Sequence, residues 1–306
     1  MLYDIIVVGA GPAGMTAAIY GRRGGKSVLM LDKLSFGGQI INTPEVENYP
    51  GFKNVSGVDL ANALFSQAID LGAEIAYGRV NRVEKQDDGN FFVGLENGKS
   101  YEGKTVILAT GAKNRPMGID REEALTGAGI SYCATCDGAF FRGRTVAVLG
   151  GGNTALEDAD VLAGIAEKVY LIHRRDQFRG EAANIDRLKK KENVEFILDT
   201  VPVEILGDMM VSGLKVKNVK TGEEREIPLN GIFVAFGQMP ENGDFTNVVD
   251  LDKAGYINAG EDCLTKTDGI FTAGDCRTKK IRQIVTATAD GSAAALEAIE
   301  YLNKID

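Results

Sequence analysis

Short apolar runs that end in glycine recur along this chain, and a stretch that favours a helix follows each of them. The first run covers residues 4–9, an alanine-rich stretch follows at 15–23, and a second apolar run at 27–31 ends at Asp32. Short β-branched runs closed by glycine are typical of buried parallel strands. The pattern therefore predicts a strand–helix–strand unit whose strands lie inside a sheet.

The same order of elements occurs again in the middle of the chain. A strand is expected at 145–149, a helix at 155–163 and another strand at 168–172. Further apolar runs at 106–111 and 231–237 each end in glycine and would close the two units. Repeated alternation of strands and helices predicts an α/β fold, here with two Rossmann-like dinucleotide-binding domains.

The end of the chain resembles the end of the first unit, which bears on how the domains are connected. Residues 269–275 have the apolar character of 106–111, and a helix is expected at about 286–302. The simplest arrangement inserts the second domain into the first. The expected first domain comprises residues 1–116 and 245–306, and the expected inserted domain comprises 117–244.

Length and charge agree with this organisation. The chain has 306 residues, more than a single core usually supports, and its formal charge of −9 argues against a nucleic-acid partner. The lysine runs at 189–191 and 279–280 are short, and we expect them to be solvated surface. No run reaches the roughly 18 apolar residues that span a bilayer, and no signal peptide precedes the first strand. We therefore expect a cytoplasmic protein without a membrane segment.

The loop after the first strand carries a complete G-x-G-x-x-G motif. Its residues are Gly9, Ala10, Gly11, Pro12, Ala13 and Gly14. Glycines here permit a tight turn and let backbone N–H groups reach a pyrophosphate at the start of the helix. Asp32 lies 23 residues after Gly9, where a carboxylate holds ribose hydroxyls in such folds. We therefore expect a dinucleotide with free ribose hydroxyls.

The second unit carries a G-x-G-x-x-A motif, but its second strand ends in basic residues. The motif residues are Gly150, Gly151, Gly152, Asn153, Thr154 and Ala155, and the basic residues are His173, Arg174, Arg175 and Arg179. A carboxylate would repel a 2′-phosphate, whereas guanidinium groups neutralise it and donate hydrogen bonds. This unit therefore predicts an NADPH site. His173 is expected to contact the nucleotide or to pack, and not to act as a general base.

Cys133 and Cys136 form a C-x-x-C pair just before the second unit. In a reducing compartment such a pair indicates metal binding or thiol–disulfide exchange. Zinc normally needs four ligands, and the chain has one histidine and no second C-x-x-C pair, so we expect no metal. Asp137 follows at once and would either exchange protons with the thiols or cap a helix. A flavin is expected as well, because hydride donors do not reduce a disulfide directly.

These motifs together resemble the low-molecular-weight NADPH-dependent thioredoxin reductases, a class II pyridine nucleotide-disulfide oxidoreductase family, over essentially the whole chain. The most specific matches are 133–138, with the sequence Cys-Ala-Thr-Cys-Asp-Gly, and 173–179. Further matching segments are 9–14, 37–39, 45–51, 109–112, 273–275 and 282–283. The resemblance implies electron transfer from NADPH through FAD and the cysteine pair to oxidised thioredoxin.

The resemblance also implies roles that the motifs alone do not give. Cys136 would be the thiol nearer the flavin, Cys133 would attack the thioredoxin disulfide, and Asp137 would be the acid–base group. The family is homodimeric and swivels its domains about linkers, expected here at 113–118 and 241–246. FAD contacts are implied for Gly37, Gly38, Gln39, Asn48, Gly111, Asp275, Arg282 and Gln283.

The chain departs from the family's usual pattern at a few positions. Asn153 and Thr154 replace an acid–serine pair, and Gly180 stands where alanine is more common; we expect little effect from either change. Cys276 is expected to be a small buried side chain near the flavin. Cys263 is expected in a partly exposed turn with no redox role.

Four other classes of protein share some of these features. A ferredoxin-driven relative and a flavin dithiol oxidase would lack the second glycine motif and its arginines. The flavoprotein of a peroxide-reducing system would carry an extra N-terminal thioredoxin-like region, whereas this chain begins at the first strand. A non-catalytic nucleotide-binding regulator would not need two closely spaced thiols. The sequence therefore favours the thioredoxin reductase interpretation.

Overall fold

The chain folds into two compact units. In this computed structural model, which describes residues 1–305, one unit comprises Met1–Lys113 and the chain from Met239 onward, and the other comprises Asn114–Gln238. Both boundaries lie a few residues before the positions expected from the sequence. The reason is that the linkers are themselves short strands, β7 (Ala112–Asn114) and β16 (Gln238–Pro240), which pair with each other.

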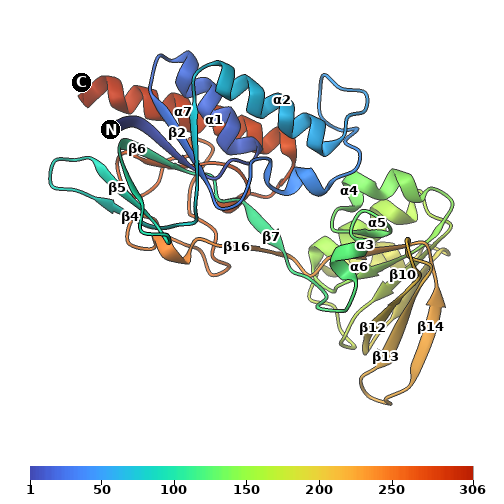
Figure 1. Cartoon of the computed structure of the whole chain (residues 1–306). Helices are drawn as coiled ribbons and strands as arrows, with labels where there is room; N and C mark the ends of the chain where they lie inside the picture. The colour runs from blue at the N-terminus through green and yellow to red at the C-terminus, as the bar shows by residue number, and fades with distance from the viewer. Residues whose placement is uncertain (306) are drawn as a thin grey trace. The chain divides into compact units, whose positions relative to one another are not determined.

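The first unit is built on a mostly parallel sheet (Figure 1). Its strands are β1 (Leu2–Val8), β2 (Val28–Asp32), β3 (Glu74–Tyr77), β4 (Val80–Lys85), β5 (Phe91–Leu95), β6 (Ser100–Leu108) and β17 (Ile270–Thr272). Its helices are α1 (Pro12–Arg23), α2 (Gly57–Asp70) and α7 (Ile284–Ile305). The strand order is β3-β2-β1-β6-β5-β4, and β17 pairs with the second half of β6. Only β4 and β5 run antiparallel to their neighbours.

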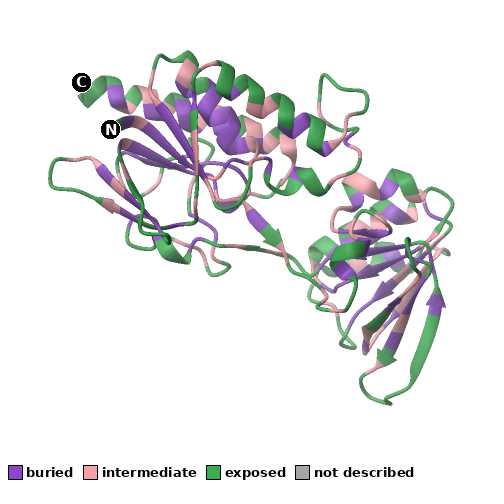
Figure 2. Ribbon diagram, in the orientation of Figure 1, coloured by how far each residue is buried: buried purple, intermediate pink, exposed green. Residues whose placement is uncertain are grey.

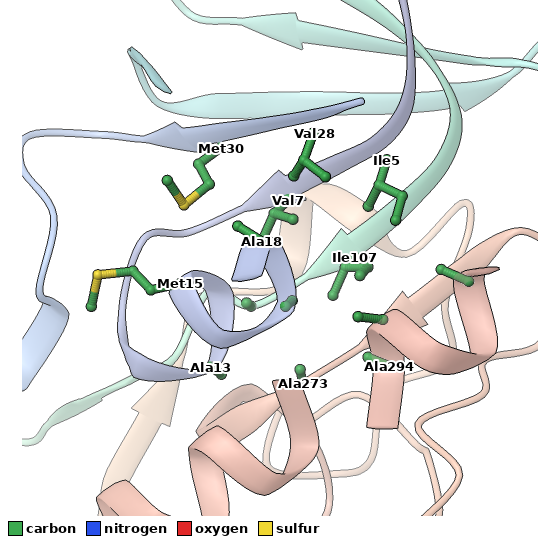
Figure 3. Close-up of a cluster of buried hydrophobic side chains, with 14 of the residues drawn as sticks. Ile5, Val7, Ala13, Met15, Ala18, Val28, Met30, Ile107, Ala273 and Ala294 are labelled. Carbon is green, nitrogen blue, oxygen red and sulfur yellow. The ribbon is translucent and has the colours of Figure 1, made fainter. Parts of the chain in front are cut away.

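Helices α1 and α7 cover one face of this sheet and approach each other closely (Figures 1 and 3). Their contacting side chains are small: Ala13 and Ala18 of α1 are buried together with Ala294 of α7. A Cβ added to Gly291 would lie only 2.2 Å from the carbonyl oxygen of Ala13. The small residues therefore bring the start of α1, which carries the first glycine motif, against the C-terminal part of the chain.

The second unit repeats this plan. Its parallel sheet has the order β11-β10-β9-β15-β8, and a three-stranded antiparallel sheet, β12-β13-β14, is added to it. The strands are β8 (Ile130–Ser131), β9 (Thr145–Leu149), β10 (Lys168–Ile172), β11 (Val194–Ile197), β12 (Thr200–Leu206), β13 (Gly213–Asn218), β14 (Glu224–Pro228) and β15 (Gly231–Val234). The helices are α3 (Glu122–Leu125), α4 (Ala134–Asp137), α5 (Asn153–Ala163) and α6 (Ala182–Lys189).

In both units the central strands are buried while the outer sides of the helices are exposed (Figure 2). Ile6 in β1 and Ala147 in β9 are both completely buried, as expected for strands inside a parallel sheet. Helix α1 begins three residues earlier than expected, because Pro12 suits the first helical position. Within residues 1–305, none of the helices combines the length and apolar character that a membrane span requires.

Candidate active site

The first glycine motif forms a tight loop between β1 and α1. Gly9 has a φ of 110°, and a Cβ there would lie 2.2 Å from the carbonyl oxygen of Ala109. Only glycine tolerates this combination. At the end of β2, Oδ2 of Asp32 accepts the backbone N–H of Ala10 at 2.8 Å. Asp32 thus fixes the loop, and its carboxylate retains lone pairs for a ligand.

Segments distant in sequence converge on this loop. Gly37 donates its N–H to the carbonyl oxygen of Ala10 at 2.7 Å. A Cβ added to Gly38 would lie 3.2 Å from Cα of Gly11, so these two backbones are in contact. From the other end of the chain, Gly274 lies against Ala13, since an added Cβ would be 2.8 Å from that methyl group. The structure therefore brings Gly37, Gly38 and the turn before Asp275 to the first motif.

Two more of the expected flavin residues also meet. Nδ2 of Asn48 donates to Oε1 of Gln283 at 3.3 Å, although 235 positions separate them. The guanidinium carbon of Arg282 lies 4.2 Å from the centre of the Tyr256 ring. Gln39 lies in the short helix Gly38–Asn42, and Gly111 lies in the turn after β6. Within residues 1–305, no hydrogen bond joins Gln39 or Gly111 to the first motif.

The fit of a flavin dinucleotide can be tested on unpaired polar atoms. Among the described residues, Oδ1 of Asp275 and Nε of Arg282 are buried without a protein partner. Buried polar atoms nearly always have partners. The carboxylate oxygen of Asp275 is therefore suited to a ligand hydroxyl, and the N–H of Arg282 to a ligand acceptor. Burial raises the pKa of Asp275. Space is open at Gly11, where the nearest atom to an added Cβ is 3.9 Å away. These residues therefore fit FAD.

A buried charge cluster, which sequence reasoning missed, supports the turn that carries Asp275. Oδ2 of Asp290 on α7 accepts the N–H of Gly274 at 2.9 Å, Nε of Arg277 at 2.8 Å and Nζ of Lys279 at 2.9 Å. Its Oδ1 accepts Nη2 of Arg277 at 2.7 Å. The Lys279 side chain is only 6% exposed. The expectation that Lys279 is solvated surface is therefore wrong, because Asp290 compensates its charge inside the unit.

The two cysteines outside the redox pair are both buried. Cys263 was expected in a partly exposed turn, and that expectation is wrong: its side chain is completely buried in the core beside α7. Burial raises the pKa of its thiol to about 12. Cys276 is buried as expected, and its Sγ lies 3.4 Å from the carbonyl oxygen of Leu108.

The second glycine motif opens α5 and is packed against the loop after β10. The N–H of Arg179 donates to the carbonyl oxygen of Gly151 at 2.7 Å. The His173 ring fills the space beside the motif, since a Cβ on Gly151 would lie 2.2 Å from its Cε1. Nε2 of His173 is 3.1 Å from the carbonyl oxygen of Gln177, and burial lowers the pKa of His173. His173 therefore shapes this loop by packing.

The three arginines that follow β10 are available for a ligand. Arg174, Arg175 and Arg179 are exposed, and nowhere in residues 1–305 does a hydrogen bond or ion pair hold their guanidinium groups. The remaining motif residues open α5, with Asn153 and Thr154 exposed and Ala155 buried. A Cβ on Gly152 would meet nothing within 4 Å. Open space at a helix start and free guanidinium groups fit a nucleotide with an additional phosphate.

Cys133 and Cys136 form a disulfide with their Cα atoms 5.3 Å apart. Sγ of Cys133 caps α4 by accepting the N–H of Cys136 at 3.2 Å. Asp137 makes no side-chain cap, so the capping alternative is wrong; its Oδ2 accepts the hydroxyl of Ser131 at 2.5 Å. Burial raises the pKa of Asp137. A carboxyl that keeps its proton closer to neutral pH suits proton exchange with the neighbouring thiols.

Two further carboxyl groups near the disulfide escaped sequence reasoning. Glu122 of α3 is buried and accepts the hydroxyl of Tyr132, the residue before Cys133. Asp158 of α5 interacts with the backbone N–H of Ala134, and burial raises the pKa of Asp158 to about 7. A weak signal existed for Asp158, since it lies three positions after buried Ala155 and therefore near the same helix face.

Comparison with known proteins agrees with this geometry. The sequence profile described as pyridine nucleotide-disulphide oxidoreductase matches residues 3–291. The chain belongs to the pyridine nucleotide-disulphide oxidoreductase family. Its members use flavin and pyridine nucleotide cofactors, which is what the two glycine motifs indicate.

Individual relatives are more specific. A thioredoxin reductase of Listeria monocytogenes is 44% identical over 306 residues, covering 99% of this chain and 95% of that protein. A thioredoxin reductase of Bacillus subtilis is 41% identical, with 99% and 96% covered. The crystal structure of thioredoxin reductase from Streptococcus pyogenes has a TM-score of 0.94 at 41% identity, with 99% of each chain covered. The predicted fold, with two Rossmann-like domains, and the resemblance to thioredoxin reductases are confirmed.

Proposed function

We propose that this protein is an NADPH-dependent thioredoxin-disulfide reductase with FAD as its cofactor. The observation that carries the proposal is the Cys133–Cys136 disulfide, followed directly by the partly buried Asp137. The relatives named thioredoxin reductase support this assignment. In the net reaction NADPH and one proton reduce the disulfide of thioredoxin, which yields NADP⁺ and two thiols.

FAD is proposed to bind the first glycine motif. Backbone N–H groups at the start of α1 would hold its pyrophosphate. Asp32 and Asp275 would accept hydrogen bonds from its hydroxyl groups, and Arg282 would use the Nε that lacks a protein partner. When bound, a flavin relays two electrons between a hydride donor and a disulfide. The other proposed FAD residues are Gly9, Gly11, Pro12, Ala13, Gly14, Gly37, Gly38, Gln39, Asn48, Gly111 and Gln283.

NADPH is proposed to bind the second motif. Gly150, Gly152, Asn153, Thr154 and Ala155 would form the pyrophosphate loop, and the side chains that follow β10 would hold the 2′-phosphate. Arg174, Arg175 and Arg179 are exposed around the well-packed His173. NADH lacks the phosphate that would occupy these guanidinium groups, so it should bind more weakly.

The cysteine pair and Asp137 would carry out the exchange with thioredoxin. The reduced Cys133 thiolate attacks one sulfur of the thioredoxin disulfide, forming a mixed disulfide and releasing the other sulfur as a thiolate. Asp137 supplies the proton that neutralises a thiolate formed in the exchange. Cys136 then attacks the sulfur of Cys133, which releases reduced thioredoxin and restores the Cys133–Cys136 disulfide.

The setting of this reaction is also part of the proposal. We expect a homodimer in the cytoplasm, as the family resemblance implies. Because NADPH and the cysteine pair would use the same flavin in turn, the reaction would need the two units to reorient about the linkers. The linkers contain the paired strands β7 and β16. Reorientation would therefore change backbone angles beside these strands.

An anaerobic titration of the purified flavoprotein tests the proposal. NADPH should bleach the flavin absorbance at far lower concentration than NADH. The variant Cys136→Ser should still be bleached by NADPH but should no longer reduce thioredoxin. If neither nucleotide bleaches the flavin, a ferredoxin-driven reductase or a dithiol oxidase becomes the better assignment. If Cys136→Ser still reduces thioredoxin, the cysteine pair is not the route.

A further inference from the structure

Residues 131–137, here called the redox loop, are held by two carboxyl groups that have no part in the exchange chemistry proposed above. The first belongs to Glu122, whose residue is only 7% exposed. Its Oε1 accepts the hydroxyl of Tyr132 at 2.5 Å and the N–H of Met117 at 2.8 Å. Its Oε2 accepts the N–H of Gly118 at 2.9 Å. Both oxygens of this buried carboxylate therefore have donors, as burial of a charge requires.

The bond between Glu122 and Tyr132 acts directly on the chain before Cys133. A hydroxyl that donates to a carboxylate forms a short, charge-assisted hydrogen bond. Burial and this bond both raise the pKa of Tyr132, so its hydroxyl keeps the proton that it donates. Because Glu122 also binds the backbone at Met117 and Gly118, it ties Tyr132 to a segment fifteen positions earlier. The chain on the N-terminal side of Cys133 is thereby fixed.

Asp158 acts on the other side of Cys133. Its carboxyl interacts with the N–H of Ala134, the first residue of α4, whose N–H has no acceptor within that helix. Ala134 is also packed against α5, in one apolar cluster with Ala155 and Ala159. Helix α5 thus contributes both a carboxyl group and a packing surface to the surroundings of the residue after Cys133.

We propose that Glu122 and Asp158 are positioning residues that hold the redox loop so that Cys133 and Cys136 stay at disulfide distance. The proposal rests on the proposed function, in which this pair cycles between disulfide and dithiol. Reduction breaks the S–S bond and adds two electrons and two protons, after which only the surrounding chain keeps the sulfurs together. A held loop gives one thiol a high effective concentration beside the other and so favours the disulfide.

Loosening either side of the loop should therefore make the disulfide easier to reduce. Tyr132→Phe removes one hydroxyl, keeps the ring, and leaves Glu122 its two backbone donors. Asp158→Ala removes the carboxyl group beside Ala134, whereas Asp158→Asn keeps a carbonyl oxygen there. Asp160→Ala is the matched control, since Asp160 lies on the same helix but pairs with Lys191 and Arg187.

The measurement is a redox titration of the full-length, flavin-loaded protein in dithiothreitol buffers. Samples are quenched in acid, alkylated after unfolding and weighed by mass spectrometry, which counts reduced cysteines. For Tyr132→Phe and Asp158→Ala we expect the equilibrium constant to shift about 10-fold toward the dithiol, equivalent to about 30 mV. Asp158→Asn should restore the native value, and Asp160→Ala should not shift it.

Each side of the loop is decided separately. An unchanged equilibrium in Tyr132→Phe overturns the role of Glu122, and an unchanged equilibrium in Asp158→Ala overturns that of Asp158. An equal shift in Asp160→Ala would show general loosening of α5 and would also overturn the role of Asp158. Should Asp158→Ala fail to fold, Asp158→Leu is titrated in its place, and a native equilibrium there counts against the proposal. The titration uses neither NADPH nor thioredoxin, so its outcome remains readable if the proposed function fails.

Discussion

Gly180 lies directly against Asn153. A methyl group added to Gly180 would be 2.8 Å from Oδ1 of Asn153 and 2.4 Å from Cδ1 of Leu156. Oδ1 of Asn153 also accepts the N–H of Glu181 at 2.7 Å. Two positions at which this chain departs from the family's usual pattern are therefore in contact. Asparagine at 153 goes with glycine at 180 because the loop after β10 lies tightly on the start of α5.

The variant Gly180→Ala tests this contact. The methyl group would force Asn153 and Leu156 to move, so we expect a loss of about 1–3 kcal/mol in the free energy of unfolding. The loop that carries Arg179 would move too, which should weaken NADPH binding. Urea unfolding and NADPH titration measure the two effects. Gly243→Ala is the control, because an added Cβ there meets nothing within 4 Å. Equal behaviour of the two variants would contradict the prediction.

The double variant Arg174→Ala/Arg175→Ala should lose preference for NADPH. A hydrogen bond to a charged group contributes roughly 1.5–3 kcal/mol, so we expect the Kd for NADPH to rise at least about 10-fold. The Kd for NADH should stay nearly constant. Flavin bleaching with each nucleotide measures this. Arg142→Ala removes an exposed arginine of the same unit and serves as the control. If the Kd values for NADPH and NADH rose equally, the result would indicate a damaged fold and not a lost phosphate site.

Asp290→Asn should destabilise the first unit and weaken FAD retention. The substitution removes the buried counter-charge of Arg277 and Lys279, and such a loss costs about 3–5 kcal/mol. It also disturbs the bond to Gly274, next to Asp275. Urea unfolding measures the stability. FAD retention is measured by the amount of released flavin that passes a filter which holds back the protein. Glu300→Gln breaks an exposed pair on the same helix, where we expect less than about 1 kcal/mol. Native FAD retention in Asp290→Asn would contradict the prediction.

The pKa of Asp158 implies a pH-dependent stability. Burial raises that pKa from 3.8 to about 7, and the charge of Glu157 adds to the rise. Between these two values the native protein binds one proton more than the unfolded chain, so stability falls as pH rises, by up to about 1.4 kcal/mol per pH unit. The penalty is complete above the native pKa. Asp158→Asn cannot ionise, so its free energy of unfolding relative to that of the native protein should rise from about pH 4 to about pH 7, as measured by urea unfolding. A constant difference across that range would refute a protonated Asp158.

The sequence was a good guide wherever the signal is local. Glycine spacing located both loops, and the C-x-x-C spacing located the disulfide, because each feature depends on a few neighbouring residues. Polar residues whose burial depends on distant partners were misjudged. The sequence around Lys279 suggests solvent-exposed surface, but in the fold its ammonium group is buried and pairs with Asp290 on α7. Cys263 follows two acidic residues that suggest an exposed turn, yet its own side chain enters the core.

The positioning carboxyls were missed for a related reason. Glu122 follows a glycine- and proline-containing linker and reads as an ordinary first-turn acid of a helix. Only the fold shows that its oxygens accept hydrogen bonds from the N–H groups of Met117 and Gly118 and from the hydroxyl of Tyr132. The two units divide a few residues before the expected boundaries, where strand pairing between β7 and β16 joins segments more than a hundred residues apart.

Because Cys263 and Cys276 are buried, labelling of this protein with a thiol reagent should measure the oxidation state of Cys133 and Cys136 alone. Both side chains are completely buried, and the thiol of Cys263 resists ionisation. A maleimide added to the folded protein should therefore not react with these two thiols, since thiolates at accessible positions are the species that react. The oxidised protein should take up no label and the reduced protein should take it up only at the redox pair. The stoichiometry of labelling then reads the oxidation state directly, and no cysteine has to be replaced to obtain it.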